Sequence, residues 1–187
     1  MPFTLRGERV LLRDWRDDDL PAWVAMNADP AVRRYFPSVL DEAAALGEAS
    51  RIRAHAEREG FTFWALDIPG VADFAGFVGL IRTGFDAHFT PCVEIGWRLA
   101  QAYWGQGYAS EAARLALQQG FDTLQLDEIV ALTVPANLPS QAVMQRIGMR
   151  RDPSDDFDHP RLSDGHPLQR HLLYRIKRQD WRAQLSA

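Results

Sequence analysis

Residues 93–112 read VEIGWRLAQAYWGQGYASEA, and this stretch carries the most informative pattern in the chain. Branched and aromatic residues from Val93 to Leu99 predict a strand, and a helical pattern follows Gly105 and Gly107. Because these two glycines lack side chains, backbone N–H groups at the start of the helix can approach a bound anion closely. The helix dipole favours phosphate at the same place. The alternative interpretation is a tight turn without a ligand.

Two familiar phosphate-binding motifs do not fit this turn. A Walker loop requires Gly-Lys-Ser or Gly-Lys-Thr, and neither is present. The dinucleotide fingerprint requires a third Gly or Ala at the position that Ser110 holds. Together with the run of three strands that precedes the turn, this departure argues against a dinucleotide-binding oxidoreductase.

Hydrophobic periodicity predicts the order β-α-α-β-β-β-α-β-α-β around this stretch. The expected strands are 9–15, 61–68, 74–83, 92–99, 128–134 and 171–177. The expected helices are 20–27, 41–60, the stretch after Gly107 with its apolar positions between 113 and 124, and 137–147. Turn signals make the three central strands an antiparallel meander. A right-handed crossover then makes strands 92–99 and 128–134 parallel neighbours or near neighbours. We therefore expect a mixed α/β (α+β) domain, with a mobile loop at 152–167.

Composition limits the function classes. The chain has 187 residues, 47% of them hydrophobic, which predicts one domain over 1–187 with a sizeable core. Cys92 is the only cysteine, so an intramolecular disulfide and a multi-thiolate metal site are excluded. A net charge of −4 gives no support for a protein that coats nucleic acid, and it leaves room for a local basic patch. Charged residues interrupt the N-terminal apolar run, and no segment is long enough for a membrane span, so we expect a cytoplasmic protein without membrane contacts.

Three segments together resemble the GCN5-related N-acetyltransferase (GNAT) superfamily, in particular its RimJ/RimL-type ribosomal-protein N-terminal acetyltransferase branch. They are LRGERVLLR at 5–13, the block from Glu94 to Glu111, and NLPSQAVMQRIGM at 137–149. The resemblance covers nearly all of the chain. It implies a mostly antiparallel sheet whose parallel strand pair splays apart to admit a cosubstrate.

The same resemblance implies acetyl-CoA as cosubstrate, with no metal. The residues expected to bind it are Trp104, Gly105, Gln106, Gly107, Tyr108 and Ala109 at the turn, which holds the pyrophosphate, together with Asn137 and Ser140 on the later helix. The superfamily pattern begins with Gln or Arg three residues before the first glycine, where this chain has Ala102. This departure is usual in the RimJ/RimL branch.

Acetyl transfer to an amine requires a neutral nitrogen, a stabilised oxyanion and a proton for the departing thiolate. Because lysine titrates near ~10.4 and an α-amine near ~7.7–8.0, a base helps most with lysine. By resemblance, Glu94 is the expected base, directly or through water, and an exposed strand carboxylate is the alternative. A backbone N–H near residues 95–97 is the expected oxyanion donor. Many relatives place a Tyr acid where we align Met144, so Ser140 becomes the candidate acid, with helix capping as its alternative.

Other polar residues have simpler interpretations. Glu111 is expected to offset the helix dipole, and Cys92 to be an inert buried thiol. The histidines and aspartates of 152–171 match no zinc spacing and predict a solvated loop. Its aspartates suggest a cationic acceptor, and His88 and Phe89 are expected in the acceptor groove.

The acceptor is expected to be a peptide N-terminus or a small-molecule amine, and a homodimer stays open. The leading hypothesis is an acetyl-CoA-dependent N-acetyltransferase that transfers directly in a ternary complex. The alternative is a catalytically silent acyl-CoA-binding regulatory module.

Overall fold

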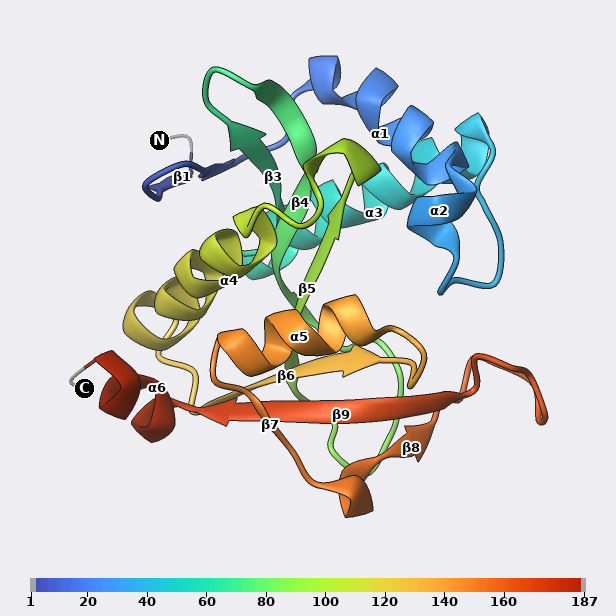
Figure 1. The fold of residues 1–187 in the computed structure, drawn as a ribbon, viewed down its shortest axis with the longest axis vertical. Helices are drawn as coiled ribbons and strands as arrows, with labels where there is room; N and C mark the ends of the chain where they lie inside the picture. The colour runs from blue at the N-terminus through green and yellow to red at the C-terminus, as the bar shows by residue number, and fades with distance from the viewer. Residues whose placement is uncertain (1–2, 186–187) are drawn as a thin grey trace.

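The computed structural model describes residues 3–185, which form an open sheet with helices on both faces (Figure 1). The strands are β1 (Thr4–Arg6), β2 (Leu11–Arg13), β3 (Phe63–Ile68), β4 (Ala72–Arg82), β5 (Val93–Leu99), β6 (Glu128–Thr133), β7 (Arg150–Arg151), β8 (Phe157–Asp158) and β9 (Arg170–Lys177). The α-helices are α1 (Leu20–Ala28), α2 (Pro30–Arg33), α3 (Glu42–Glu59), α4 (Tyr108–Gln118), α5 (Leu138–Arg146) and α6 (Arg178–Leu185). Shorter helical turns are η1 (Asp17–Asp19), η2 (Gln101–Tyr103), the π-helical η3 (Gln119–Thr123) and η4 (Pro153–Asp155).

The sheet order is β1-β2-β3-β4-β5-β6-β9-β7, with β8 paired to β9. All of these pairs are antiparallel except β5 with β6. The connection through α4 explains the exception, because a crossover helix returns the chain to the same end of the sheet. The predicted mixed α/β sheet with one parallel pair is confirmed.

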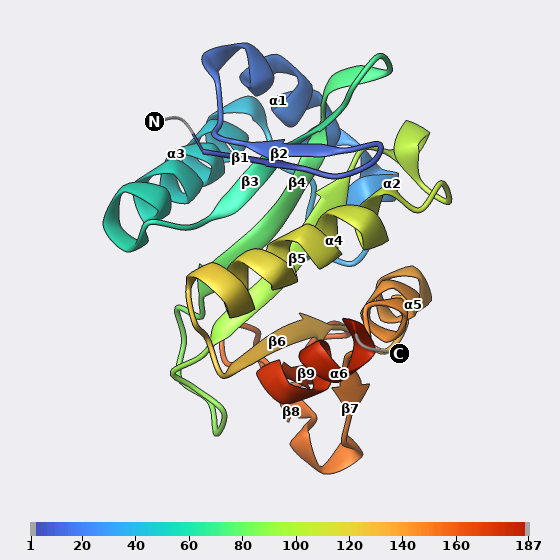
Figure 2. The ribbon, with the colours of Figure 1, turned by 90° about the vertical axis from the view of Figure 1, so that its left-hand side faces the viewer.

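Helices cover both faces of the N-terminal half of the sheet (Figure 2). On one face α4 buries its small residues Ala112, Ala113 and Ala116 against the main hydrophobic core. On the other face α1, α2 and α3 enclose a second cluster around Trp23 and Phe77. In the C-terminal half, α5 packs on the β6 and β9 face that belongs to the main core, and aromatic residues cover the opposite face.

The helix boundaries follow local chemistry. Asp41 caps α3, because its side chain accepts a hydrogen bond from Ala44 N, and Gly60 ends the helix with a φ of 76°. Asp19, which precedes α1, does not cap that helix through its side chain. Its carboxylate instead binds the buried guanidinium of Arg13, at 2.7 and 2.8 Å, and makes no cap hydrogen bond to α1.

The expected loop at 152–167 contains the η4 turn and β8. Ion pairs hold it in place: Asp155 binds Arg175, and Asp156 binds Arg151. The sequence pattern also does not predict the short elements β1, α2, β7 and α6. Within residues 3–185, no helix combines the length and the apolar character needed to cross a bilayer.

Candidate active site

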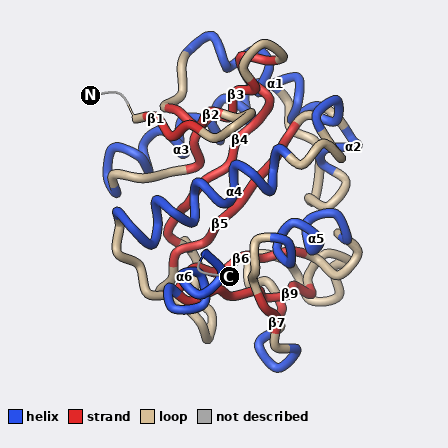
Figure 3. Tube along the Cα trace, turned by 60° about the vertical axis from the view of Figure 1, so that its left-hand side comes forward, coloured by secondary structure: helices blue, strands red, loops and turns tan. Residues whose placement is uncertain are grey.

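The parallel strands β5 and β6 separate almost as soon as they meet. Their register contains one pair, Glu94 with Val130, whereas the antiparallel β4 and β5 pair at seven positions. Beyond Glu94 a cavity of about 1070 Å³ opens between the two strands. We call it the central cavity. Figure 3 shows α4 running along β5 and α5 lying beside β6, and both helices contribute residues to its lining.

The glycine turn forms one end of the central cavity. Gly105 and Gly107 have φ values of 72° and 85°, a conformation that L side chains rarely adopt, and a Cβ at Gly105 would meet nothing within 4 Å. No hydrogen bond among residues 3–185 is donated by the backbone N–H groups of residues 105–110. Unpaired donors at the start of α4 suit a bound anion such as a pyrophosphate. The open turn therefore fits the cosubstrate that the sequence resemblance implies.

A salt bridge fastens this turn to the N-terminal hairpin. Arg9 donates from its backbone N to Glu111 Oε1 at 2.7 Å and from Nε to Oε2 at 2.9 Å. Its guanidinium also donates to the Gln106 carbonyl at 3.0 Å. A Cβ on Gly7 would lie 2.8 Å from the same Glu111 carboxylate, so glycine permits the close approach. Glu111 thus lies in the first turn of α4, as expected, and also anchors the hairpin.

The residues predicted to bind the cosubstrate at the turn lie as follows. Trp104, Gly105, Gly107, Tyr108 and Ala109 line the central cavity. The Trp104 indole N–H donates to the Leu99 carbonyl at 2.7 Å, which fixes an otherwise exposed ring. Gln106 does not line the cavity, because its side chain donates back to the Ala102 carbonyl at 3.1 Å.

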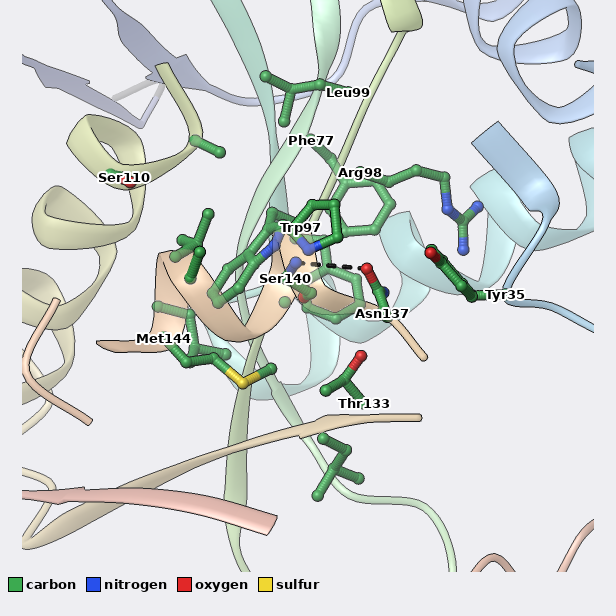
Figure 4. Close-up of a pocket in the computed structure, with 18 of the residues that line it drawn as sticks. Tyr35, Phe77, Trp97, Arg98, Leu99, Ser110, Thr133, Asn137, Ser140 and Met144 are labelled. Carbon is green, nitrogen blue, oxygen red and sulfur yellow. Dashed lines mark hydrogen bonds between the residues drawn. The ribbon is translucent and has the colours of Figure 1, made fainter. Parts of the chain in front are cut away.

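Helix α5 forms the opposite wall of the cavity (Figure 4). Asn137 is its N-cap, and the Asn137 side-chain oxygen accepts a hydrogen bond from the Ser140 backbone N at 3.3 Å. The Ser140 hydroxyl takes no part in this cap. Met144 follows one turn later and lines the same cavity while 1% exposed. The structure therefore brings Asn137 and Ser140 to the cavity, and leaves an apolar side chain where we aligned the acid of other superfamily members.

Glu94 lies on the other face of β5 from α4. Residues alternate along a strand, and Ile95 and Leu99 pack in the core with α4, so Glu94 and Arg98 share the opposite face. The Glu94 carboxyl is half-buried and lines the cavity. No hydrogen bond or ion pair to this carboxylate occurs among residues 3–185. Burial without a compensating partner raises the pKa of Glu94 to about 7.

Cys92 has the surroundings of an unreactive thiol. It is half-buried, its sulfur lies 3.0 Å from the Thr83 hydroxyl, and burial raises its pKa. It does not line the cavity.

Two histidines of the C-terminal segment, His159 and His171, lie against each other with tilted rings. The rings of His159 and His171 lie 4.9 Å apart and line the central cavity. Burial lowers the pKa of both side chains. No group of three or more potential metal ligands occurs in the described part of the chain.

Two expectations about the acceptor side are wrong. His88 and Phe89 do not line the cavity: His88 lies 3.6 Å from Asp155, and Phe89 is buried in the aromatic cluster beneath β6 and β9. The aspartates of 152–167 do not line it either. They bind neighbouring side chains: Asp152 binds Ser154, Asp155 and Asp156 bind Arg175 and Arg151, Asp158 binds Arg170, and Asp164 binds Gln169. The basis for a cationic acceptor is therefore removed.

Several residues that line the cavity are not among the predicted site residues. They are Arg9, Arg34, Tyr35, Phe36, Arg98, Arg114 and Arg146. Arg98 lies inside the quoted strand, and its alternation with Ile95 and Leu99 places it on the face of Glu94. The segment 34–36 has no periodicity, and only the folded chain brings it to β5.

Comparison with known proteins matches this architecture to one family. The family model described as an acetyltransferase (GNAT) domain matches residues 9–150. The chain belongs to the GNAT acetyltransferase family. The Bacillus subtilis N-acetyltransferase YnaD is 39% identical over 88 residues, which are 47% of this chain and 50% of that protein.

Solved GNAT structures share the fold over almost the full length. A GNAT-family acetyltransferase from Bacillus anthracis is 26% identical, with a TM-score of 0.76, and 95% of this chain and 99% of that one are covered. The Mycobacterium smegmatis RimJ structure, solved in complex with CoA-disulfide, has a TM-score of 0.70 at 24% identity and covers 94% of this chain and 86% of that one. Family membership identifies this chain as an acetyltransferase, and the GNAT family uses acetyl-CoA.

Proposed function

We propose that this GNAT acetyltransferase is an N-acetyltransferase of the RimJ/RimL type, which transfers acetyl from acetyl-CoA directly to a primary amine in a ternary complex. The acceptor is a protein N-terminal α-amine or a small-molecule amine. The observation that carries the proposal is the central cavity between β5 and β6. At one end of the cavity, the backbone N–H groups of the glycine turn are unpaired among the described residues. The Glu94 carboxyl, whose pKa is near neutrality, lies on the face of β5 that points away from α4.

The turn and α5 act in binding. The backbone N–H groups of residues 105–109 donate to the pyrophosphate, with Trp104 and Tyr108 beside it. Asn137 and Ser140 contact the arm that lies between the strands. The salt bridge from Arg9 to Glu111 keeps the turn in place, because it ties the start of α4 to the hairpin that precedes β2.

Glu94 acts as the general base, directly or through one water. With a pKa of about 7, the carboxylate is both present at neutral pH and basic enough to accept a proton from the attacking amine. As the nitrogen–carbon bond forms and the carbon–sulfur bond breaks, the amine proton goes to Glu94 and the thiolate receives a proton. The Ser140 hydroxyl, which the helix cap leaves free, is the donor we assign to that step; it regains a proton from solvent as Glu94 releases one to solvent.

The alternative is a silent acyl-CoA-binding module that keeps the turn without the chemistry. The two differ in one assay, in which the protein is incubated with acetyl-CoA and a panel of peptides, amino acids and polyamines while free thiol is followed. The proposal expects thiol release that depends on the amine, with about 10²-fold or greater loss in Glu94→Gln. Stabilisation of the fold by acetyl-CoA without acetylation of any amine would favour the silent module.

A further inference from the structure

The wall of the central cavity beside the end of α2 carries more positive than negative charge. It is built from Arg34, Tyr35 and Phe36 at the end of α2 and from Arg98 on β5, and we call it the arginine wall. In Figure 4 the Arg98 side chain extends toward Tyr35. This wall lies on the same face of β5 as Glu94, the face from which an acceptor would approach.

Buried charges behind the wall are incompletely neutralised. Arg98 and Arg33 both approach a single carboxylate, Glu48, at 3.1 and 3.8 Å. Arg98 is 8% exposed, and its Nε has no hydrogen-bond partner among the described residues. Burial and the neighbouring Arg98 lower the pKa of Arg33 to about 10, so the Arg33 guanidinium still carries its charge at neutral pH. Two cations therefore share one anion beneath the wall.

Arg34 adds a further charge at the surface of the wall. It is exposed, its guanidinium lies 4.6 Å from the Tyr35 ring, and it forms no ion pair within residues 3–185. Across the cavity Arg161 is held over the Phe85 ring at 5.8 Å and donates to the Gly84 carbonyl, again without a carboxylate partner in that part of the chain.

Among the described residues that line the cavity, Glu94 supplies the carboxylate on the acceptor side. The carboxylates that line the cavity are Glu8, Glu94 and Glu111. Glu111 is bound to Arg9 beside the glycine turn, and Glu8 precedes Arg9 in the same hairpin. A polycationic acceptor would therefore meet Arg34, Arg98 and Arg161 with only Glu94 to attract it. An acceptor with a carboxylate would meet the exposed Arg34 guanidinium, which forms no ion pair within residues 3–185.

We propose that the arginine wall selects primary amines that carry a carboxylate, which Arg34 binds while the amine lies at Glu94. The inference rests on the proposed function and narrows its acceptor class. The carboxylate is either the main-chain carboxylate of an amino acid or an acidic side chain near a peptide N-terminus. These two sources present the same chemistry to the wall.

Matched acceptors separate the two sources. The first pair is glycine with glycinamide, and the second is the peptide amides Asp-Ala-NH₂ and Asn-Ala-NH₂, each assayed for kcat/KM by thiol release. The acid and the amide in a pair differ in amine basicity. The decisive quantity is therefore the change in their ratio when Arg34→Gln is compared with the wild type. Arg51→Gln is the matched control, because Arg51 is exposed on α3 away from the cavity and its loss changes the net charge equally.

We expect Arg34→Gln to lower the acid-to-amide ratio of at least one pair about tenfold, and Arg51→Gln to leave it unchanged. The pair that responds identifies the source of the carboxylate. Two results would overturn the inference and leave the proposed function standing. The first is acetylation with acid-to-amide ratios that Arg34→Gln does not change. The second is a higher kcat/KM for a diamine such as putrescine than for any acceptor with a carboxylate.

A total lack of acetylation would count against the proposed function, and a second measurement then decides the inference. Glycine and Asp-Ala-NH₂ are titrated calorimetrically into the protein with CoA bound. The inference requires that at least one binds more weakly to Arg34→Gln, by about tenfold, than to the wild type or Arg51→Gln. Equal affinity in all three proteins would overturn it.

Discussion

Replacing Glu94 with glutamine should stabilise the protein at high pH and leave it almost unchanged at low pH. Because burial raises the pKa of Glu94 from its ordinary 4.5 to about 7, the folded state holds this proton more tightly than the unfolded state. Stability from Glu94 is therefore fully present below pH 4.5 and is lost as the pH rises through 7. The glutamine amide stays neutral at every pH, so the variant escapes this loss.

The size of the effect follows from the two pKa values. A rise from 4.5 to about 7 corresponds, at about 1.36 kcal/mol per pH unit, to a cost of about 3 kcal/mol above pH 8. At pH 5 the same calculation gives a difference in the free energy of unfolding between variant and wild type of about 1 kcal/mol or less. The half-buried position of the carboxyl makes 3 kcal/mol an upper value.

Urea unfolding, followed by tryptophan fluorescence at several pH values, measures this difference. The free energy of unfolding of Glu94→Gln minus that of the wild type should grow between pH 4.5 and 7 and then level off. In parallel, kcat/KM of the wild type should follow a group that titrates near 7, and the variant should lose that dependence together with its rate. A stability difference that is constant with pH would refute the reasoning from burial.

Three further substitutions test other parts of the site. Gly107→Val should raise the Kd for acetyl-CoA about tenfold or more, because φ is 85° and a Cβ would lie 3.3 Å from Arg9 Nη2. Gly70→Val is the control for backbone strain, because Gly70 has a φ of 79° in an open turn; this variant should leave the Kd for acetyl-CoA unchanged. Glu111→Gln removes the 2.9 Å salt bridge, and should weaken acetyl-CoA binding a few-fold while lowering stability by about 1 kcal/mol or less; a normal Kd by calorimetry would remove the hairpin from the binding account. Ser140→Ala should lower kcat about tenfold and leave the cap of α5 intact, since the cap uses only the Ser140 backbone N; an unchanged kcat would assign the proton to water.

The sheet and its crossover could be predicted because they depend on local patterns. The periodicity of α4 and the turn signals around β3, β4 and β5 are strong, and they lead directly to the observed order. The π-helical η3 extends α4 over the predicted residues to Thr123. Elements of two or three residues, such as β1 and β8, are too short for any periodicity to appear.

One part of the site could be predicted from the sequence, and another part could not. The glycine turn is contiguous in sequence, so its open backbone at Gly105 and Gly107 was visible in advance. The salt bridge that holds this turn could not be predicted, because Arg9 and Glu111 lie 102 residues apart and nothing in their spacing links them.

Charge balance depends on tertiary contacts in the same way. From the sequence alone, the aspartates of 152–167 count as negative charge available to an acceptor. In the folded chain, arginines of other strands bind Asp155 and Asp156 and offset their charge. The arginine wall forms only when the end of α2 meets β5. Predicting the sign of the acceptor side therefore required the folded chain.

A crystal structure of the protein with CoA would test the central claim most directly. The account predicts the pyrophosphate within hydrogen-bond distance of backbone N–H groups between Gly105 and Ala109, and the sulfur between β5 and β6, within reach of Ser140 and on the way to Glu94. A pyrophosphate bound away from this turn, or a sulfur that does not enter the cavity between the two strands, would contradict it.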